Sequence, residues 1–261
     1  RSLLTAKGVE IVSQPPCDVI IIRGGDGSLL GAEREWPGVP KLPLRDSEEA
    51  PLCPLHNSAS IIDDFLAGKL KLRILQKLEG SAKDRSLLGI NDVFIHSRNS
   101  VSAMRYKVWI NGELYAEEIV GDGACISTVH GSTAYYRSIT HSVFRVGLGL
   151  AFSNSTELVN HLVLPEDSEI KFKISRGPAE LDADNSPNPI LFGSGDEAIV
   201  RMSSQTAAIH ALDIFRCEEC RRLRRVRRVK ATQEQQKRAR QLREEMQRKE
   251  AAEAAARVNR E

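Results

Sequence analysis

Near its start the chain carries a short apolar run that ends in glycines. Asp18-Val-Ile-Ile-Ile-Arg23 lies between Pro15-Pro16 and Gly24-Gly25. Runs this short, continuously apolar and β-branched are typical of strands that are buried on both faces, as in a parallel α/β sheet. The sequence therefore predicts a strand that is buried on both faces and whose carboxyl end leads directly into a glycine-rich turn.

The rest of the body alternates between loop, helix and strand signals. Residues 34–57 are rich in proline and charge without a clear period and predict a loop, after which Ser58 is expected to cap a helix that ends near Leu66. From about residue 70 short strands dominate. Apolar and polar side chains alternate over residues 105–110, which predicts a strand. Asn111-Gly112 is a strong hairpin signal and joins this strand to another over residues 113–116. Residues 169–174 and 198–201 predict further strands.

The last part of the chain has a composition of its own. Residues 216–261 hold 16 Lys or Arg against 8 Asp or Glu, although the net charge of all 261 residues is only +2. Residues 221–261 lack proline and glycine, which favours a helix. We interpret this segment as a solvated, basic helical tail, and weak nonspecific contact with nucleic acid is the alternative.

These signals predict an α/β plus all-β fold. An N-terminal Rossmann-like α/β domain is expected over residues 1–66, a β-rich, sandwich-like domain over residues 67–215, and the basic tail over residues 216–261. The chain has no apolar run long enough to span a membrane, no signal peptide is expected, and the start at Arg1 is interpreted as a truncation.

Five cysteines are too few and too irregular for a secreted disulfide framework, so reduced thiols and a cytoplasmic location are expected. Cys217-Glu-Glu-Cys220 supplies only two of four zinc ligands. Cys53-x-x-His56 is far away in sequence and is not expected to complete the site, so the sequence predicts no metal ligands.

Gly24-Gly-Asp-Gly-Ser28 follows the first strand and has the composition of a phosphate-binding turn. Glycines allow close approach of a ligand to the backbone, and successive amides form a nest for phosphate oxygens. Asp26 supplies the one carboxylate, which is suited to accepting a hydroxyl proton or to holding Mg²⁺. Gly24, Gly25, Gly27 and Ser28 are the candidate phosphate ligands. A plain Gly-Asp-Gly loop is the alternative from these residues alone.

A second motif spans residues 121–135, Gly-Asp-Gly-Ala-Cys-Ile-Ser-Thr-Val-His-Gly-Ser-Thr-Ala-Tyr. It predicts a strand that enters a polar glycine turn, where Ser132 and Thr133 would cap a helix start. Tyr135 adds an aromatic face and a hydroxyl. Without further context, a Ser/Thr-rich turn with Tyr135 in the core would explain the same residues.

Together the two motifs resemble those of the NAD kinase family, over roughly residues 10–213. The first is similar to the GGDGT signature, with Ser28 in place of Thr, and the second to the segment in which GDG precedes TPTGSTAY. Asn91-Asp92 resembles the family's Asn-Glu pair, and Leu181-Asp-Ala-Asp184 its late Asp-Gly segment, with the register open between Asp182 and Asp184. Val129-His130 departs from the Pro-Thr pair, the family's Gly-Ile-Asn-x-Gly segment is not visible, and its opening strand would precede Arg1.

The resemblance implies an ATP-dependent kinase that phosphorylates the adenosine ribose 2′-hydroxyl of NAD, with Mg²⁺ accompanying ATP and Asp26 as the catalytic base. It implies a homodimer or homotetramer that acts away from membranes. A non-catalytic dinucleotide-binding protein, or a lipid or sugar kinase that shares only GGDG, remains the alternative. The residues expected to bind NAD are Asn91, Asp92, Asp122, Thr128, His130, Ser132, Thr133, Ala134, Tyr135 and Asp184.

Overall fold

The chain folds into two compact units, each made of two separate stretches of sequence. The structure is a computed structural model that describes residues 2–45, 52–99, 101–213, 217–227, 232–235, 237–238 and 241. The first unit is Arg1–Leu44 with Lys71–Ala211, and the second is Arg45–Leu70 with Leu212–Glu261. Residues 45–70 thus group with the C-terminal residues, an arrangement that the predicted domain boundaries at residues 66 and 215 do not include. Among the described helices, none is long and apolar enough to cross a membrane.

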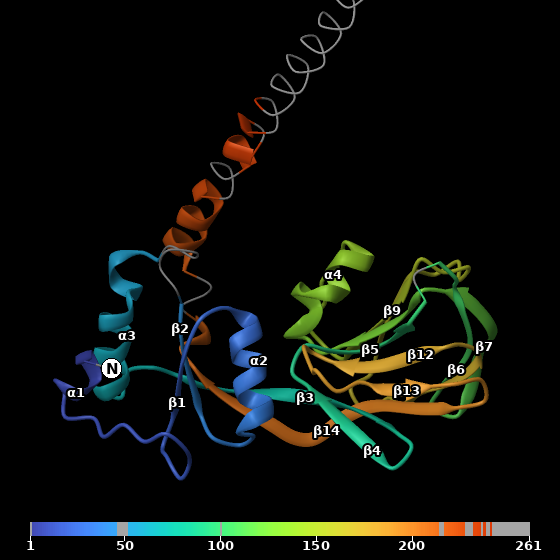
Figure 1. Cartoon of the computed structure of the whole chain (residues 1–261), viewed down its shortest axis with the longest axis horizontal. Coiled ribbons are helices and arrows are strands. Elements are labelled where there is room, and N and C mark those ends of the chain that lie inside the picture. Colours follow the sequence, from blue (N-terminus) through green and yellow to red (C-terminus); the bar gives the residue numbers. More distant parts are fainter. Residues whose placement is uncertain are drawn as a thin grey trace, which may run out of the picture. The chain divides into compact units, whose positions relative to one another are not determined.

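The first unit contains most of the regular structure (Figure 1). Its helical elements are α1 (Ser2–Thr5), α2 (Asp26–Glu35), η2 (Gly131–Thr133) and α4 (Tyr135–Thr140). Its strands are β1 (Ile20–Arg23), β2 (Lys41–Leu44), β3 (Leu72–Ala82), β4 (Arg85–Gly89), β5 (Asp92–Ser97), β6 (Met104–Ile110), β7 (Glu113–Gly121), β8 (Gly123–Ser127), β9 (Leu148–Ser153), β10 (His161–Leu164), β11 (Ile170–Arg176), β12 (Ala179–Ala183), β13 (Ile190–Phe192) and β14 (Glu197–His210).

Two sheets organise these strands. The larger has the order β1-β2-β14-β11-β6-β7, with β3 pairing with β14 and β4, and the smaller has the order β10-β9-β8-β5-β12-β13. β1 and β2 are parallel, and β2 also pairs in parallel with the far end of β14, where Ile209 faces Lys41. The parallel pair and the antiparallel strands therefore form one continuous mixed sheet, whereas the smaller sheet is wholly antiparallel.

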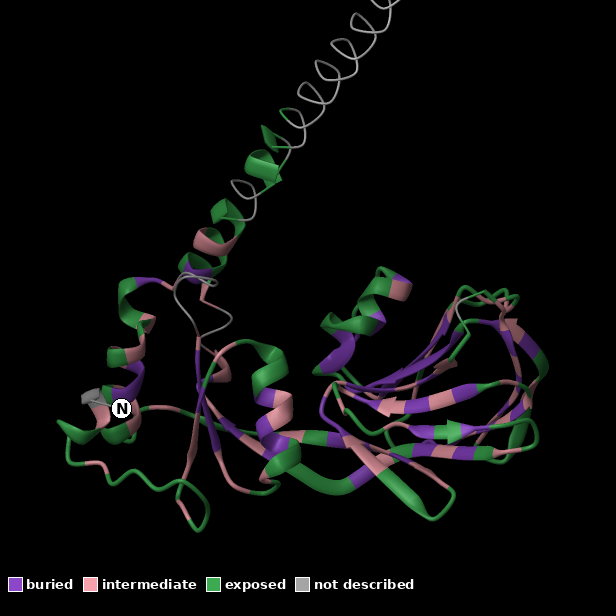
Figure 2. Cartoon of the chain, in the orientation of Figure 1, coloured by how far each residue is buried: buried purple, intermediate pink, exposed green. Residues whose placement is uncertain are grey.

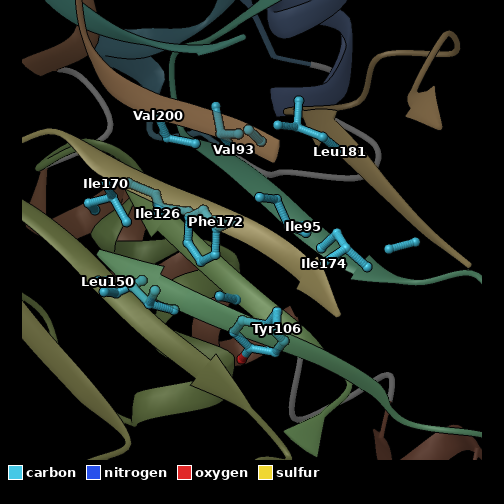
Figure 3. Packing of buried hydrophobic residues seen from close by; sticks show 14 of the residues in the cluster. Val93, Ile95, Tyr106, Ile126, Leu150, Ile170, Phe172, Ile174, Leu181 and Val200 are labelled. Atoms are coloured by element: carbon cyan, nitrogen blue, oxygen red, sulfur yellow. The ribbon is translucent and has the colours of Figure 1, made fainter. Parts of the chain in front are cut away.

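The main hydrophobic core lies where the two sheets contribute inward-facing side chains (Figure 3). Val93 and Leu150 come from the smaller sheet, and Tyr106, Phe172 and Val200 from the larger one; all are buried. Buried and partly exposed residues alternate along β6, β11 and β12, as Figure 2 shows in colour. This alternation is the period of two that the sequence displayed, and it confirms the predicted sandwich-like, β-rich part.

The local strand and turn signals are confirmed, except that β1 is not buried on both faces. β1 lies within the apolar run but is at the edge of the larger sheet, and of its residues only Ile22 is buried. The hairpin between β6 and β7 turns at Asn111-Gly112. Both turn residues have positive φ, +52° and +82°, as the tight two-residue hairpin requires. The Asn111 side chain also accepts a hydrogen bond from the Glu169 amide at 2.9 Å, which fixes the turn beside β11.

The loop predicted over residues 34–57 is wrong in part. β2 lies within it, and its four residues are buried. Pro43 faces Ile22 in β1, while β14 reaches β2 only at Lys41. Proline has no amide hydrogen, but β14 does not pair with β2 at Pro43, so no hydrogen bond between these strands is lost. Burial of β2 therefore overrides the tendency of proline to break strands.

In the second unit, η1 (Pro54–His56) precedes α3 (Ser58–Leu66). The predicted helix is confirmed, but Asn57 caps it and not Ser58, because the Asn57 side chain accepts the Ser60 amide at 2.9 Å. A further helix runs over residues 218–227. Most of the predicted tail beyond it lies outside the described residues.

A buried charge cluster joins α2 to the larger sheet. Glu33 of α2 forms ion pairs with Lys41 of β2 and Lys77 of β3, and all three side chains are at most 4% exposed. Lys41 also donates to the Trp36 carbonyl. Its burial lowers the pKa of Lys41, and the Glu33 carboxylate opposes that shift. One carboxylate thus compensates two buried amines.

We expect Glu33→Gln to destabilise the protein strongly. Glutamine keeps the shape of the side chain but leaves two buried amines without an anionic partner, and breaking a buried pair in this way costs about 3–5 kcal/mol. Glu35→Gln, on the exposed face of the same helix, should change the free energy of unfolding by less than about 0.5 kcal/mol. Urea unfolding followed by circular dichroism measures both, and equal effects of the two variants would contradict the role of Glu33.

Candidate functional site

The glycine turn after β1 is also the start of α2. Gly24 has φ +148° and its amide donates to the Leu44 carbonyl at 3.0 Å. The first helical bond runs from the Leu29 amide to the Gly25 carbonyl, so the amides of residues 26–28 lie at the open N-terminal end of the helix. Helix N-termini favour anions. The Gly24 amide, one of the predicted phosphate donors, already donates to the Leu44 carbonyl, so it is less available to a phosphate than the amides of residues 26–28.

Asp26 and Ser28 occupy this first turn of α2, and both are exposed. The backbone of Gly24 approaches the Ser28 side chain so closely that a Cβ on Gly24 would collide with the Ser28 hydroxyl oxygen. Gly24 is therefore required both for its positive φ and for its lack of a side chain. A carboxylate and a hydroxyl are thus presented next to open amides.

Asn185 joins this turn to the loop after β12. Its side-chain amide donates to the Gly27 carbonyl at 2.9 Å, and its own oxygen accepts Arg34 from the far end of α2 at 2.9 Å. The Arg34 guanidinium also contacts the Asn185 carbonyl at 3.2 Å. α2 is therefore held against residue 185 from both of its ends.

Asp184, the preceding residue, organises the second half of the site. One carboxylate oxygen accepts the Ile90 amide at 2.7 Å, and the other accepts the amides of Asn91 and Asp92 at 2.8 and 3.2 Å. The backbone of Asp184 is left-handed, with φ +52°. The carboxylate thus fixes the Asn91-Asp92 segment through its backbone, which makes Asp184 a positioning residue.

Asn91 and Asp92 lie between Asp184 and the second motif. The Asn91 carbonyl accepts the Thr128 amide at 2.9 Å and the Ser127 hydroxyl at 3.2 Å. Asp92 is 9% exposed. Burial, and after it the nearby Asp184 carboxylate, raise the pKa of Asp92 to about 7. Burial also raises the pKa of Asp184, although its three amide donors oppose the shift.

The polar turn of the second motif packs on the same segment. Thr128 donates to the Ile90 carbonyl at 2.6 Å and accepts the Gly131 amide at 3.0 Å, while Gly131 lies so close to the Asn91 backbone that any side chain would collide with it. Ser132 donates to the carbonyls of Val129 and Phe144. Thr128 and Ser132 are buried and build the turn. The expected cap by Ser132 and Thr133 is not found: Ala134 precedes α4, without a side-chain cap.

Other members of the motif face outward. His130, Thr133, Ala134 and Tyr135 are exposed, with 45% of Tyr135 accessible. The Tyr135 ring meets Phe94 edge to face at a centroid distance of 4.9 Å. Burial and the neighbouring Cys125 thiol raise the pKa of Tyr135, and the carboxylates of Asp92 and Asp122 add to that shift. The Asp122 carboxylate itself accepts a hydrogen bond from the Asn154 side-chain amide at 2.8 Å.

Phe94 and His96 belong to this surface and were not predicted from the sequence. The His96 ring stacks on the Phe94 ring at a centroid distance of 4.9 Å. Asp182, one of the two alternatives for the late Asp-Gly segment, accepts a hydrogen bond from the His96 ring at 2.9 Å. Glu180 lies 3.3 Å from the same ring nitrogen. Asp92, Phe94 and His96 alternate along β5, so the period of two could have placed them on one face.

Two hollows on the described surface overlap only in part with the predicted site residues. A cavity of about 350 Å³ is lined by Arg34, Lys77, Ile90 and Asp184, beside the segment that joins the two motifs. A more open hollow of about 480 Å³ follows residues 81–86 and contains no motif residue. Neither motif lines the first cavity, so we locate the site by the hydrogen bonds that connect both motifs through Asn185, Asp184 and residues 90–92.

The raised pKa of Asp92 predicts a specific pH dependence. The folded protein keeps a proton on Asp92 up to about pH 7, whereas the unfolded chain loses it near pH 4, so stability should fall as the pH rises through this window. Asp92→Asn should flatten the fall, which is on the order of a few kcal/mol. Asp167→Asn, at an exposed carboxylate, is the control. Denaturation at several pH values tests this, and an unchanged slope in Asp92→Asn would contradict it.

Curated relatives align with much of the chain, although no family model matches it. A protein of Cupriavidus pinatubonensis named NAD kinase is 31% identical over 205 residues, which cover 72% of this chain and 66% of that protein. One of the same name from Alcanivorax borkumensis is 30% identical over 181 residues, covering 61% and 57%. The chain thus spans less than two thirds of the length of these relatives.

Solved structures share the fold. The yeast NADH kinase complexed with NADH superposes with a TM-score of 0.64 at 24% identity, over 75% of this chain and 62% of that one. An NAD kinase from Archaeoglobus fulgidus in complex with ATP superposes with a TM-score of 0.68 at 19% identity, over 82% and 89%. With both sequence motifs joined in one site on this fold, the chain belongs to the NAD kinase family.

Proposed function

We propose that the protein is an NAD kinase that transfers the γ-phosphoryl group of ATP to the adenosine ribose 2′-hydroxyl of NAD. The observation that carries this proposal is the hydrogen-bonded path from α2 through Asn185 and Asp184 to Asn91 and the turn at Thr128. It joins a phosphate-type turn to a surface suited to a nucleoside. The relatives named NAD kinase support the same activity.

In the proposed complex the backbone amides of Gly25 and of residues 26–28, at the start of α2, bind phosphate oxygens. Ser28 donates to the same group. The exposed carboxylate of Asp26 fits the oxygen preference of Mg²⁺, which would accompany ATP and offset its charge when bound. Phosphoryl transfer depends on such positioning and charge compensation.

NAD would lie on the surface formed by the second motif. The Asn91 side chain and the Asp92 carboxylate would bind the adenosine moiety, with the exposed Tyr135 and His130 beside it. Asp184, Thr128 and Ser132 would act indirectly, by holding the backbone in place. The ribose oxygen bonds to the γ-phosphorus, the bond to the ADP oxygen breaks, and Asp26 accepts the hydroxyl proton.

We also propose that the protein is a homodimer or homotetramer and that it acts in the cytoplasm. The oligomer rests on the family resemblance alone, and light scattering would test it. The location is in keeping with five cysteine thiols, none of which is paired in a disulfide. A monomer with full activity would contradict the first of these proposals.

Asp26→Asn should lower turnover by at least about a hundredfold, because general-base contributions are typically about 10²–10⁴-fold. NAD affinity should change little. Glu35→Gln, on the same helix, controls for the lost charge and should retain turnover. NADP formation from ATP and NAD measures the rate, and calorimetry measures NAD binding. If Asp26→Asn is as active as the wild type, Asp26 is not the base. If the wild type binds NAD but forms no NADP with any donor, it is a binding protein.

Asn91→Ala should show the opposite pattern. Removing the side-chain amide should weaken NAD binding by about 1–3 kcal/mol, since a polar group of NAD would lose its partner. Turnover at saturating NAD should fall much less than it does in Asp26→Asn. The same two measurements apply, and an unchanged NAD affinity would remove Asn91 from the binding surface.

A further inference from the structure

The second unit contains four side chains that the proposed activity does not use. Cys53 precedes η1 and His56 is its last residue, while Cys217 precedes the helix over residues 218–227 and Cys220 lies in its first turn. His56 and Cys220 are 164 positions apart in sequence. All four nevertheless converge, and their ligand atoms lie within 4.8 Å of one another.

The spacing of these atoms matches a tetrahedral metal site. The His56 Nδ1 atom lies 3.3 Å from the Cys53 sulfur and 3.3 Å from the Cys220 sulfur. Around Zn²⁺, with Zn–S near 2.3 Å and Zn–N near 2.0–2.1 Å, neighbouring ligand atoms are separated by about 3.5–3.8 Å. A small adjustment of side chains would therefore close the set on one ion.

The backbone presents each pair of ligands on one tight turn. The His56 amide donates to the Cys53 carbonyl at 2.9 Å, and the Arg221 amide donates to the Cys217 carbonyl at 3.0 Å. The Cys53 amide also donates to the Cys220 sulfur at 3.3 Å, across the two segments. Amide donors of this kind stabilise a metal-bound thiolate.

Burial and ligand type favour a closed zinc site. Cys53 is 4% exposed and Cys220 is fully buried, while His56 and Cys217 are half-buried. Three thiols and one imidazole select zinc over the hard ions Mg²⁺ and Ca²⁺. A disulfide would pair two of the three thiols but would give the imidazole no reason to lie among them.

We propose that Cys53, His56, Cys217 and Cys220 bind one structural Zn²⁺, which joins the two chain segments of the second unit. Cys217-x-x-Cys220 alone supplies only two of four ligands, and the fold brings Cys53 and His56 to it as the other two. The second unit is small and its two segments are distant in sequence, which is where a metal adds most to stability.

Metal analysis of the purified full chain tests the proposal. Mass spectrometry of the elements should find close to one zinc per chain, and cobalt should replace it with the visible spectrum of a tetrahedral thiolate site. Cys53→Ser, Cys220→Ser and His56→Ala should lose the bound metal. Cys17→Ser and Cys125→Ser, at cysteines outside the cluster, should retain it.

A conservative variant separates loss of the ligand from loss of the fold. His56→Cys keeps a ligand at this position, so it should retain zinc and show an altered cobalt spectrum, whereas His56→Ala should not retain it. A wild-type chain that binds no zinc with its thiols reduced would overturn the proposal. Equal metal loss in Cys17→Ser, or a disulfide within the cluster in place of metal, would overturn it as well.

Discussion

The candidate site depends on one half-buried carboxylate that accepts hydrogen bonds from three backbone amides. Asp184 fixes residues 90–92, and the next residue, Asn185, reaches the first turn of α2. Two motifs about a hundred positions apart in sequence thereby share one rigid connection. Because the amides belong to the backbone, a change of side chain at Ile90 or Asn91 leaves these bonds in place. A neutral residue at position 184 would weaken all three, since bonds to a charged acceptor are the stronger ones.

The second motif contains both buried and exposed side chains. Thr128, Gly131 and Ser132 are buried and hold the turn on the Asn91 backbone. His130, Thr133 and Tyr135 belong to the same motif and are exposed. The motif thus contains both the buried residues that build the turn and the exposed residues that we propose to contact NAD.

Features set by neighbouring residues could be predicted from the sequence, and features set by distant partners could not. The turn after Arg23 and the hairpin at Asn111-Gly112 follow from adjacent residues, whose conformational preferences are local. β2 could not be predicted, because its burial comes from β1 on one side and β14 on the other. Likewise, nothing in sequence joins His56 to Cys220, and the role of Asp184 depends on amides that no pattern displays.

The separation in sequence between β2 and its neighbour β14 has a consequence for synthesis of the chain. β2 is made early, yet its second neighbour is the carboxyl end of β14, at Ile209. At about 5–20 residues per second, the ribosome needs on the order of 10 s to make the intervening chain. For that time the Lys41 end of β2 lacks its second neighbour, and an unpaired strand edge is a known starting point for aggregation. The nascent chain therefore has a defined interval in which a chaperone would be of use, and the interval ends when β14 leaves the ribosome.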